Sequence, residues 1–298
     1  MERQLFSLVY QWLVLVGRTH PRGRRRFSDT VIVAVLVWAV LHDRPIFWAC
    51  QQINWPGDRP WLLQFPSPAT MSRRLRTYGI HLLLEQLASF LRDQFPKHLL
   101  KIVDAKPLPV GGATKDRDAR RGYAINGFAK GYKIHALFDA GGILEAWRLE
   151  PMNRGESLVG AQLLREHPGA GYVVADSNYD TRRFYQAAGR AGWQAIVRPK
   201  YPHAQSRYRL AQNPFRARGL ELAANPLWPL GQVASFGQDL LELRDIVERR
   251  FAAWTNFGGG LAPLPNWVRT PHRVVVWIHA KIILAMARDI KLNRNLAA

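Results

Sequence analysis

The spacing of apolar residues changes near residue 98. Before that point, apolar side chains recur at intervals of three and four residues, as between Leu5 and Val16, which is the pattern of an amphipathic helix. A second segment, Thr30 to Leu41, is continuously apolar and follows Ser28, a residue type that favours helix starts. Residues 1–97 are therefore expected to form an all-helical domain.

The pattern after residue 98 consists of short apolar or β-branched runs separated by glycine and proline, which predicts strands. The expected strands cover residues 101–105, 132–138, 143–149, 172–175 and 194–197. The expected helices cover residues 157–166, 181–191, 241–256 and 272–291. Residues 139–142 have the composition of a hairpin turn, and residues 199–240 read as an inserted basic loop.

The resulting order, β-β-β-α-β-α-β, predicts a mixed sheet with helices on both faces. This order is that of a ribonuclease H-like core. We therefore expect an α/β domain over residues 98–298, following the helical domain.

One segment of the helical region has the features of a DNA-reading helix. In Pro66 to Arg76, Ser67 can cap a helix and Pro68 suits its first position. Three basic residues follow within it, Arg73, Arg74 and Arg76. The segment resembles the recognition helix of a helix-turn-helix. A solvated basic helix end is an equally good interpretation.

Three acidic residues stand where the backbone can hold a carboxylate rigidly. Asp104 and Asp176 each end an apolar run, and Glu248 lies in a predicted amphipathic helix. Two carboxylates at strand ends and a third on a late helix suit a pair of divalent ions. The hard, oxygen-preferring ions Mg²⁺ and Mn²⁺ are the expected occupants.

Four other carboxylates are the nearest rival ligands: Asp139, Asp180, Glu242 and Asp245. Of these, Asp180 precedes a predicted helix and is expected to cap it. Arg244 lies one helical turn before Glu248, so the two side chains share a face. Its guanidinium is expected to contact phosphate, with a simple ion pair to Glu248 as the alternative.

The charge of the chain indicates what such a site acts on. Forty-two Lys and Arg residues against 22 Asp and Glu give a net charge of +20, which attracts polyanions, and nucleic acid above all. A membrane is not an expected partner, because the longest uncharged apolar run falls short of the ~20 residues that span a bilayer. The single cysteine, Cys50, excludes an internal disulfide and fits the cytoplasm.

Further basic residues accompany the acidic ones. The expected DNA-binding set comprises Arg73, Arg74, Arg76, Lys106, Lys115, Arg120, Arg121, Lys130, Lys133 and Arg244. Lys133 alternates with His135 on a predicted strand that has one polar face. We expect His135 to be a hydrogen-bonded structural histidine.

Four motifs in this order resemble the DDE transposases of bacterial insertion sequences. They are Ile102 to Pro107, Gly131 to Asp139, Val174 to Asp180 and Arg244 to Phe251. The resemblance covers roughly residues 100–255. It implies a DNA transposase that binds the inverted-repeat ends of its element, cleaves double-stranded DNA and joins it to a target. It also implies two Mg²⁺ or Mn²⁺ ions, held by Asp104, Asp176 and Glu248, and a homodimer in the DNA complex.

The chain departs from the family pattern at several positions. Family members usually have Lys or Arg and then Gly after the second aspartate, where this chain has Ser177 and Asn178. Around Glu248, only Arg244 and the glutamate remain of a four-residue signature. Two other functions therefore stay open: a stand-alone metal-dependent nuclease, and a catalytically inactive DNA-binding derivative.

Overall fold

The computed structural model describes residues 2–19, 26–57, 64–112, 114–124, 127–200, 213–224, 236–256, 261 and 263–296. The chain forms two compact units. The first contains Met1–Phe95, Lys115–Asp118 and Ala253–Ala298, and the second contains Pro96–Thr114 and Ala119–Ala252. None of the described helices is both long and apolar enough to cross a lipid bilayer.

The first unit is helical, as the periodicity predicted. Its elements are α1 (Glu2–Gly17), α2 (Asp29–Leu41), α3 (Ile46–Ala49), η1 (Gln52–Asn54), α4 (Pro68–Arg74), α5 (Tyr78–Arg92) and α12 (Pro271–Leu296). Both predicted caps are confirmed: Ser28 Oγ accepts a hydrogen bond from Val31 N at 3.3 Å, and Ser67 Oγ accepts one from Thr70 N at 3.2 Å.

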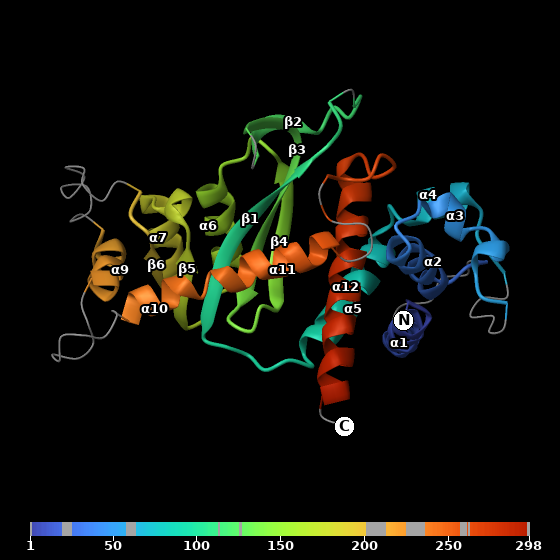
Figure 1. Cartoon of the computed structure of the whole chain (residues 1–298), viewed down its shortest axis with the longest axis horizontal. Helices are drawn as coiled ribbons and strands as arrows, with labels where there is room; N and C mark the ends of the chain where they lie inside the picture. Colours follow the sequence, from blue (N-terminus) through green and yellow to red (C-terminus); the bar gives the residue numbers. More distant parts are fainter. Residues whose placement is uncertain are drawn as a thin grey trace. The chain divides into compact units, whose positions relative to one another are not determined.

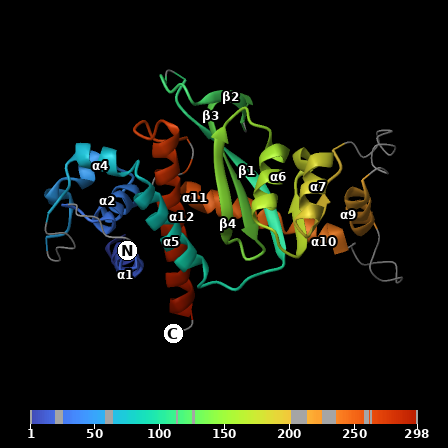
Figure 2. The same ribbon diagram turned by 180° about the vertical axis from the view of Figure 1, so that it is seen from behind.

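The helix α12 belongs to this unit, whereas the sequence placed all residues after 97 in the catalytic domain. It packs against α1, α2 and α5, and α5 runs beside it in Figures 1 and 2. Residues such as Val274, Ile278 and Ile282 are buried along it. Helical periodicity shows that a face is buried but not which helices bury it.

The second unit contains the sheet. Its strands are β1 (Leu100–Pro109), β2 (Arg120–Ala124), β3 (Gly127–Asp139), β4 (Leu144–Pro151), β5 (Gly171–Ala175) and β6 (Trp193–Val197). Its helices are α6 (Glu156–Glu166), η2 (Ser177–Tyr179), α7 (Arg182–Arg190), α9 (Pro214–Ala224), α10 (Phe236–Glu242) and the larger part of α11 (Asp245–Asn256).

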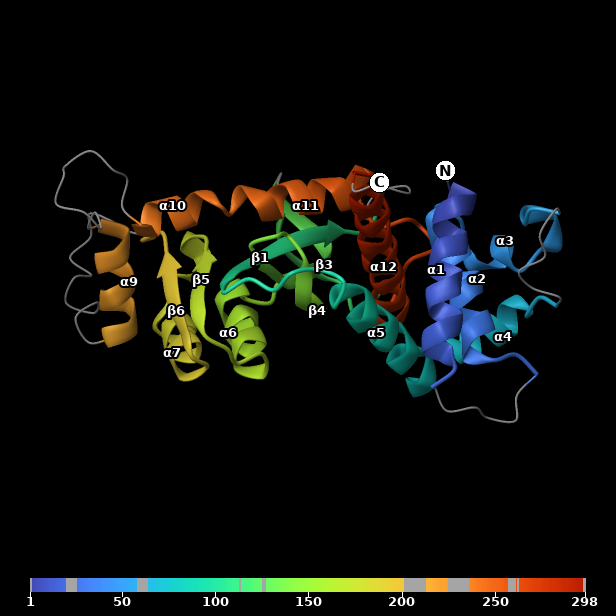
Figure 3. The same ribbon diagram turned by 90° about the horizontal axis from the view of Figure 1, so that it is seen from below.

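The sheet is mixed. Its strand order is β2-β3-β1-β5-β6, with β4 also paired to β3. β1 is antiparallel to β3 and parallel to β5, and β6 is parallel to β5. In Figure 3, α6 and α7 lie on one face, whereas α10 and α11 run along the other. The α/β, ribonuclease H-like class predicted from the sequence is confirmed.

The strand β2 was not predicted. It pairs with the first half of β3 to form a two-stranded ribbon in which Arg121 faces Lys130 and Tyr123 faces Phe128. Because side chains alternate along a strand, these four residues share one face. The opposite face is built largely of glycine and alanine, and a Cβ at Gly122 would lie only 2.4 Å from the Met152 carbonyl oxygen. The ribbon therefore packs on the protein through its small residues.

The predicted basic insert contains regular structure. Residues 201–212 and 225–235 lie outside the described part of the chain, but α9 lies between them and packs against β6 and α7. Arg216 of this helix donates to both oxygens of Asp180, from Nε and Nη2, each at 2.7 Å. Asp180 is only 3% exposed, so a buried ion pair fastens α9 to the turn after β5.

The packing of α9 on β6 can be tested at Gly219. A Cβ at this position would lie 2.4 Å from the Ala195 carbonyl oxygen, which is a backbone atom and cannot move aside. In an exposed helix, Gly→Ala stabilises by about 1 kcal/mol. Here we expect Gly219→Ala to destabilise the protein by about 1–3 kcal/mol, as overpacking does.

The midpoint of urea unfolding measures this effect. Gly111→Ala is the control, because a Cβ at Gly111 meets nothing within 4 Å. A Gly219→Ala variant that unfolds at a higher urea concentration than the wild type would show that α9 does not pack as described.

Candidate active site

Two aspartates meet at the centre of the sheet because β1 and β5 are parallel neighbours. The last pair in their register is Val103 with Ala175, and Asp104 and Asp176 directly follow it. Val103 and Ala175 belong to the buried core beneath α6 and α7. Alternation along the strands therefore directs the two aspartates to the opposite face, which α11 covers.

Burial disfavours the charge on both aspartates. The pKa of Asp104 is raised to about 7, mainly by burial and also by the neighbouring carboxylates of Asp176 and Glu156, whereas the Ala105 N–H and Arg244 lower it. Burial is also the main reason that the pKa of Asp176 is raised, and Glu156 adds to it. The positive charge of the nearby side chains therefore does not fully offset the cost of burying two ionised carboxylates.

The predicted third carboxylate, Glu248, lies on α11 and is 66% exposed. Its Oε1 lies 3.7 Å from Nη2 of Arg244, which is the ion pair that the sequence offered as the alternative role of Arg244. The same arginine also acts electrostatically on Asp104 and Asp176. Its Nε is buried and has no hydrogen-bond partner among the described residues.

Lys106 lies near both the aspartates and α11. Its Nζ lies 5.7 Å from the centre of the Phe251 ring on α11. Burial lowers the pKa of Lys106, and the charges of Asp104 and Glu248 partly offset this effect. Lys106 therefore lies within electrostatic reach of both carboxylates.

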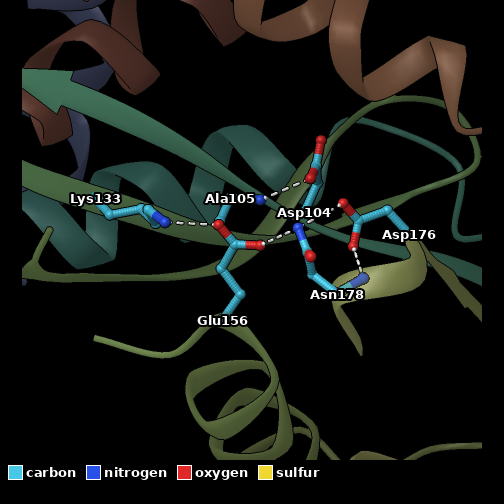
Figure 4. A network of polar contacts seen from close by, with 6 residues as sticks. All are labelled: Asp104, Ala105, Lys133, Glu156, Asp176 and Asn178. Atoms are coloured by element: carbon cyan, nitrogen blue, oxygen red, sulfur yellow. Dashed lines mark hydrogen bonds and ion pairs between the residues drawn. The ribbon is translucent and has the colours of Figure 1, made fainter. Parts of the chain in front are cut away.

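A fourth carboxylate, Glu156 at the first position of α6, was missed by the sequence interpretation. Its Oε1 accepts a hydrogen bond from Lys133 Nζ at 2.6 Å, and its Oε2 accepts one from Asn178 Nδ2 at 3.2 Å. Asn178 also donates to Asp176, so Figure 4 shows a continuous polar network from Lys133 to Asp176. Glu156 precedes a helix after a turn, and no periodicity or apolar run marks it.

Two of the four rival carboxylates, Asp139 and Asp180, have other partners. Asp139 accepts a hydrogen bond from Ile143 N at 2.8 Å within the β3–β4 turn, which confirms the predicted hairpin. Asp180 binds Arg216, and the prediction that it caps α7 was wrong. Thr181 is the cap, with its side chain accepting from Phe184 N at 3.3 Å, because the helix begins one residue later than the prediction required.

Two buried side chains near the site have no hydrogen-bond partner in the described part of the chain. Both ring nitrogens of His135 are unpaired, contrary to the expectation of a hydrogen-bonded histidine. Burial and then the charge of Lys133 lower its pKa to about 3, so the ring is neutral. The Tyr179 hydroxyl is also unpaired, and its pKa is raised by burial and by the nearby charge of Asp104.

The predicted DNA-binding residues fall into three groups. Exposed residues comprise Arg73, Arg76, Lys115, Arg120 and Arg121, and half-buried ones comprise Lys106, Lys130 and Arg244. The other two residues form ion pairs within the protein. Lys133 pairs with Glu156, and Arg74 pairs with Asp29 and donates to the Phe27 carbonyl at 2.8 Å. Arg74 is 12% exposed, so its guanidinium does not project from α4 toward DNA as predicted.

Among the described residues, no three His, Cys, Asp or Glu side chains are grouped closely enough to hold a metal ion together. The acidic pair nevertheless suits a hard cation. Asp104 and Asp176 offer oxygen ligands, and burial, which is the main cause of their raised pKa values, disfavours their negative charge unless added positive charge compensates it. A divalent cation at this position would supply that charge.

The pKa of Asp104 predicts how stability depends on pH. Because its pKa in the folded protein is raised to about 7, the folded state retains a proton that the unfolded chain releases near pH 4. Stability of the metal-free protein therefore decreases as pH rises through this window. We expect Asp104→Asn to raise the melting temperature at pH 8, and the gain to shrink as pH falls toward 4.

Melting temperatures in the presence of a chelator, measured from pH 4 to pH 8, check this expectation. Asp245→Asn is the control, because Asp245 is an exposed residue of α11. A gain that stays constant across the pH range would contradict the burial of an ionised Asp104.

Among solved structures, the chain is similar to a piggyBac transposase in a synaptic complex with hairpin DNA, with 9% identity and a TM-score of 0.49, covering 95% of this chain and 71% of that one. It also matches the simian T-cell lymphotropic virus intasome in complex with the PP2A regulatory subunit B56 gamma, with 14% identity and a TM-score of 0.23, covering 57% of each chain. No curated protein sequence matches the chain significantly.

The family comparison is more specific. Residues 95–286 match the transposase DDE domain family. This range covers more than half of the chain and includes both aspartates, Glu156 and Glu248. The chain therefore belongs to the transposase DDE domain family.

Proposed function

We propose that this protein is the transposase of an insertion sequence. It binds the terminal inverted repeats of its own element, cleaves the DNA in a metal-dependent reaction and joins the freed ends to a target. The observation that carries this proposal is the placement of Asp104, in the middle of β1, beside Asp176, which directly follows the parallel strand β5, with Arg244 and Lys106 in electrostatic reach of Asp104. Membership of the transposase DDE domain family supports it.

The acidic residues would hold the divalent ions. Asp104 and Asp176 are the central ligands, and Glu248 on α11 is the third. Two such ions, when bound, activate the attacking oxygen and stabilise the leaving oxygen of a phosphodiester. Asp104 must lose its proton to bind a cation, and its raised pKa places that step near neutral pH.

Two cationic side chains of the site are suited to contact phosphate. Lys106 lies within electrostatic reach of Asp104 and Glu248, and Arg244 pairs with Glu248 while its buried Nε has no partner among the described residues. A phosphate oxygen beside the carboxylates would provide an acceptor for Arg244. The two interpretations of Arg244 are therefore compatible, since one guanidinium has five N–H donors.

The ribbon of β2 and β3 is a second DNA-binding surface. Its outward face carries Arg121 and Lys130 beside two aromatic rings, Tyr123 and Phe128, which are 72% and 64% exposed. The ring centroids lie 4.2 Å apart. A two-stranded ribbon fits the major groove of DNA, and the basic residues suit its phosphates.

The two rival functions make different predictions for one assay. A stand-alone nuclease would cleave a labelled transposon end without joining it to a target. An inactive derivative would bind the end and do neither. Cleavage and joining by the same preparation in Mg²⁺ support the transposase, and the DNA flanking the gene supplies the substrate.

The acidic residues can be tested separately from DNA binding. Asp104→Asn, Asp176→Asn and Glu248→Gln each keep the shape of the side chain but remove a charged ligand. We expect each variant to lose cleavage and joining while retaining DNA affinity, as measured by fluorescence anisotropy. Asp245→Asn on α11 is the matched control and should cleave normally. Wild-type cleavage by any of the three variants would remove that residue from the site.

Recognition of the element's ends is expected to depend on the exposed Arg73 of α4. If this side chain contacts bases, Arg73→Ala should weaken specific end binding by about 1–3 kcal/mol and leave non-specific binding almost unchanged. Arg121→Ala with Lys130→Ala should instead weaken binding to all sequences and reduce its salt dependence. Titrations against the end sequence and a scrambled duplex at several salt concentrations separate the two effects.

Arg74→Ala should behave differently from Arg73→Ala, because Arg74 pairs with Asp29 inside the helical unit. Its main effect should be a lower melting temperature. Equal losses of specific and non-specific binding in Arg73→Ala would show that α4 contributes only charge.

A further inference from the structure

The polar network behind Asp176 uses both oxygens of two carboxylates. Asn178 donates from its backbone N to Asp176 Oδ1 at 2.9 Å and from Nδ2 to Asp176 Oδ2 at 3.3 Å. The same Nδ2 donates to Glu156 Oε2 at 3.2 Å, and Lys133 donates to Glu156 Oε1 at 2.6 Å. Figure 4 shows the chain of contacts from β3 through α6 to the turn after β5.

We propose that Lys133, Glu156 and Asn178 are positioning residues, which hold the Asp176 carboxylate in place for a divalent ion, and that Glu156 is the central member. This inference rests on the proposed function, because it assigns these side chains to the same acidic site. None of the three is required to touch the ion. They act by orienting the carboxylate of Asp176 and by influencing its charge.

The burial of the Lys133–Glu156 ion pair supports a role in positioning Asp176. The two side chains are 7% and 19% exposed. Burying an ion pair costs desolvation energy that its mutual attraction does not reliably recover, so such a pair is weak evidence for a stabilising role. Here the pair has a second consequence. Lys133 neutralises Glu156, so Glu156 can lie beside the two aspartates and hold Asn178.

The choice of Asn178 also supports the role. A glycine at this position would have no side chain that could link Asp176 to Glu156. An asparagine amide can donate two hydrogen bonds, and here it donates to both carboxylates. Asn178 therefore makes a direct connection between the second aspartate and α6.

A separate observation indicates that a polar ligand belongs among these carboxylates. The Tyr179 side chain is fully buried, and its hydroxyl has no hydrogen-bond partner within the described part of the chain. Asp104, Glu156 and Asp176 all lie within electrostatic reach of it. Buried hydroxyls normally have partners, and a coordinated water of a bound ion would supply one.

The test is Mn²⁺ binding to the full-length, DNA-free protein. The electron paramagnetic resonance signal of free Mn²⁺ measures how much of the ion stays unbound. Outer residues that orient metal ligands typically change affinity about 10–100-fold when replaced. We expect an increase of this size in the Kd for Mn²⁺ in Glu156→Gln and in Asn178→Ala. This readout does not depend on DNA cleavage.

Two matched controls should bind Mn²⁺ as the wild type does. Glu145→Gln disrupts a comparable pair of the same sheet, in which Lys101 is 8% exposed and Glu145 26%. Ser177→Ala alters the residue between Asp176 and Asn178 without touching the network. Weaker binding in Glu145→Gln as well would assign the effect to general loss of buried pairs and overturn the proposal.

Glu156→Gln leaves Lys133 buried without its partner and can fail to fold for that reason. The double variant Lys133→Met with Glu156→Gln removes both charges. Its Kd for Mn²⁺ can be measured if the single variant does not fold. A folded single or double variant that binds Mn²⁺ with wild-type affinity overturns this positioning role but leaves the proposed function intact. Failure of the wild type to bind Mn²⁺ contradicts both this inference and the metal-dependent function on which it rests.

Discussion

The parallel pairing of β1 with β5 is the constraint on which the acidic site depends. The register that sets Val103 beside Ala175 also brings Asp104 close to Asp176, since Asp104 is the next residue of β1 and Asp176 is the first residue after β5. The apolar layer beneath them fixes the register, because a slip of one residue would turn Val103 and Ala175 out of the core. The same packing therefore builds the hydrophobic core and places the carboxylates.

That placement has an electrostatic cost, and the surrounding residues reduce it in different ways. Hydrogen bonds from Ala105 N and Asn178 N favour the ionised forms of the two aspartates, and Arg244 does so through its charge. Lys133 neutralises Glu156, the carboxylate that would otherwise add most to the repulsion on the α6 side. The compensation stays incomplete, and an acidic site in this condition favours an added cation.

The sequence predicted the parts of this site that depend on local pattern. Asp104 and Asp176 could be predicted because a short apolar run marks each strand and its end, and the strand order followed from the same runs. The strand β2 was missed because Arg120 to Ala124 contains glycine and no β-branched residue. The insert was read as a loop because its charged and proline-rich composition hides the face of α9 that packs on β6.

Other features depend on residues far apart in the chain, which no local pattern reveals. Arg74 looked available for DNA, but its partner Asp29 lies 45 residues earlier. No local pattern marks Glu156, and only the fold brings Lys133 and Asn178 to its two oxygens. In both cases a charged side chain acquired its role from tertiary contacts.

The packing of α12 with α1, α2 and α5 has a consequence for synthesis of the protein. The helical unit lacks one of its central helices until the ribosome has translated the whole sheet unit, because Asp93 to Thr270 separate α5 from α12. At about 5–20 residues per second, this interval is on the order of 10 s. During it, the apolar sides of the early helices stay uncovered by α12, so newly made chains of this protein are a natural substrate for chaperones.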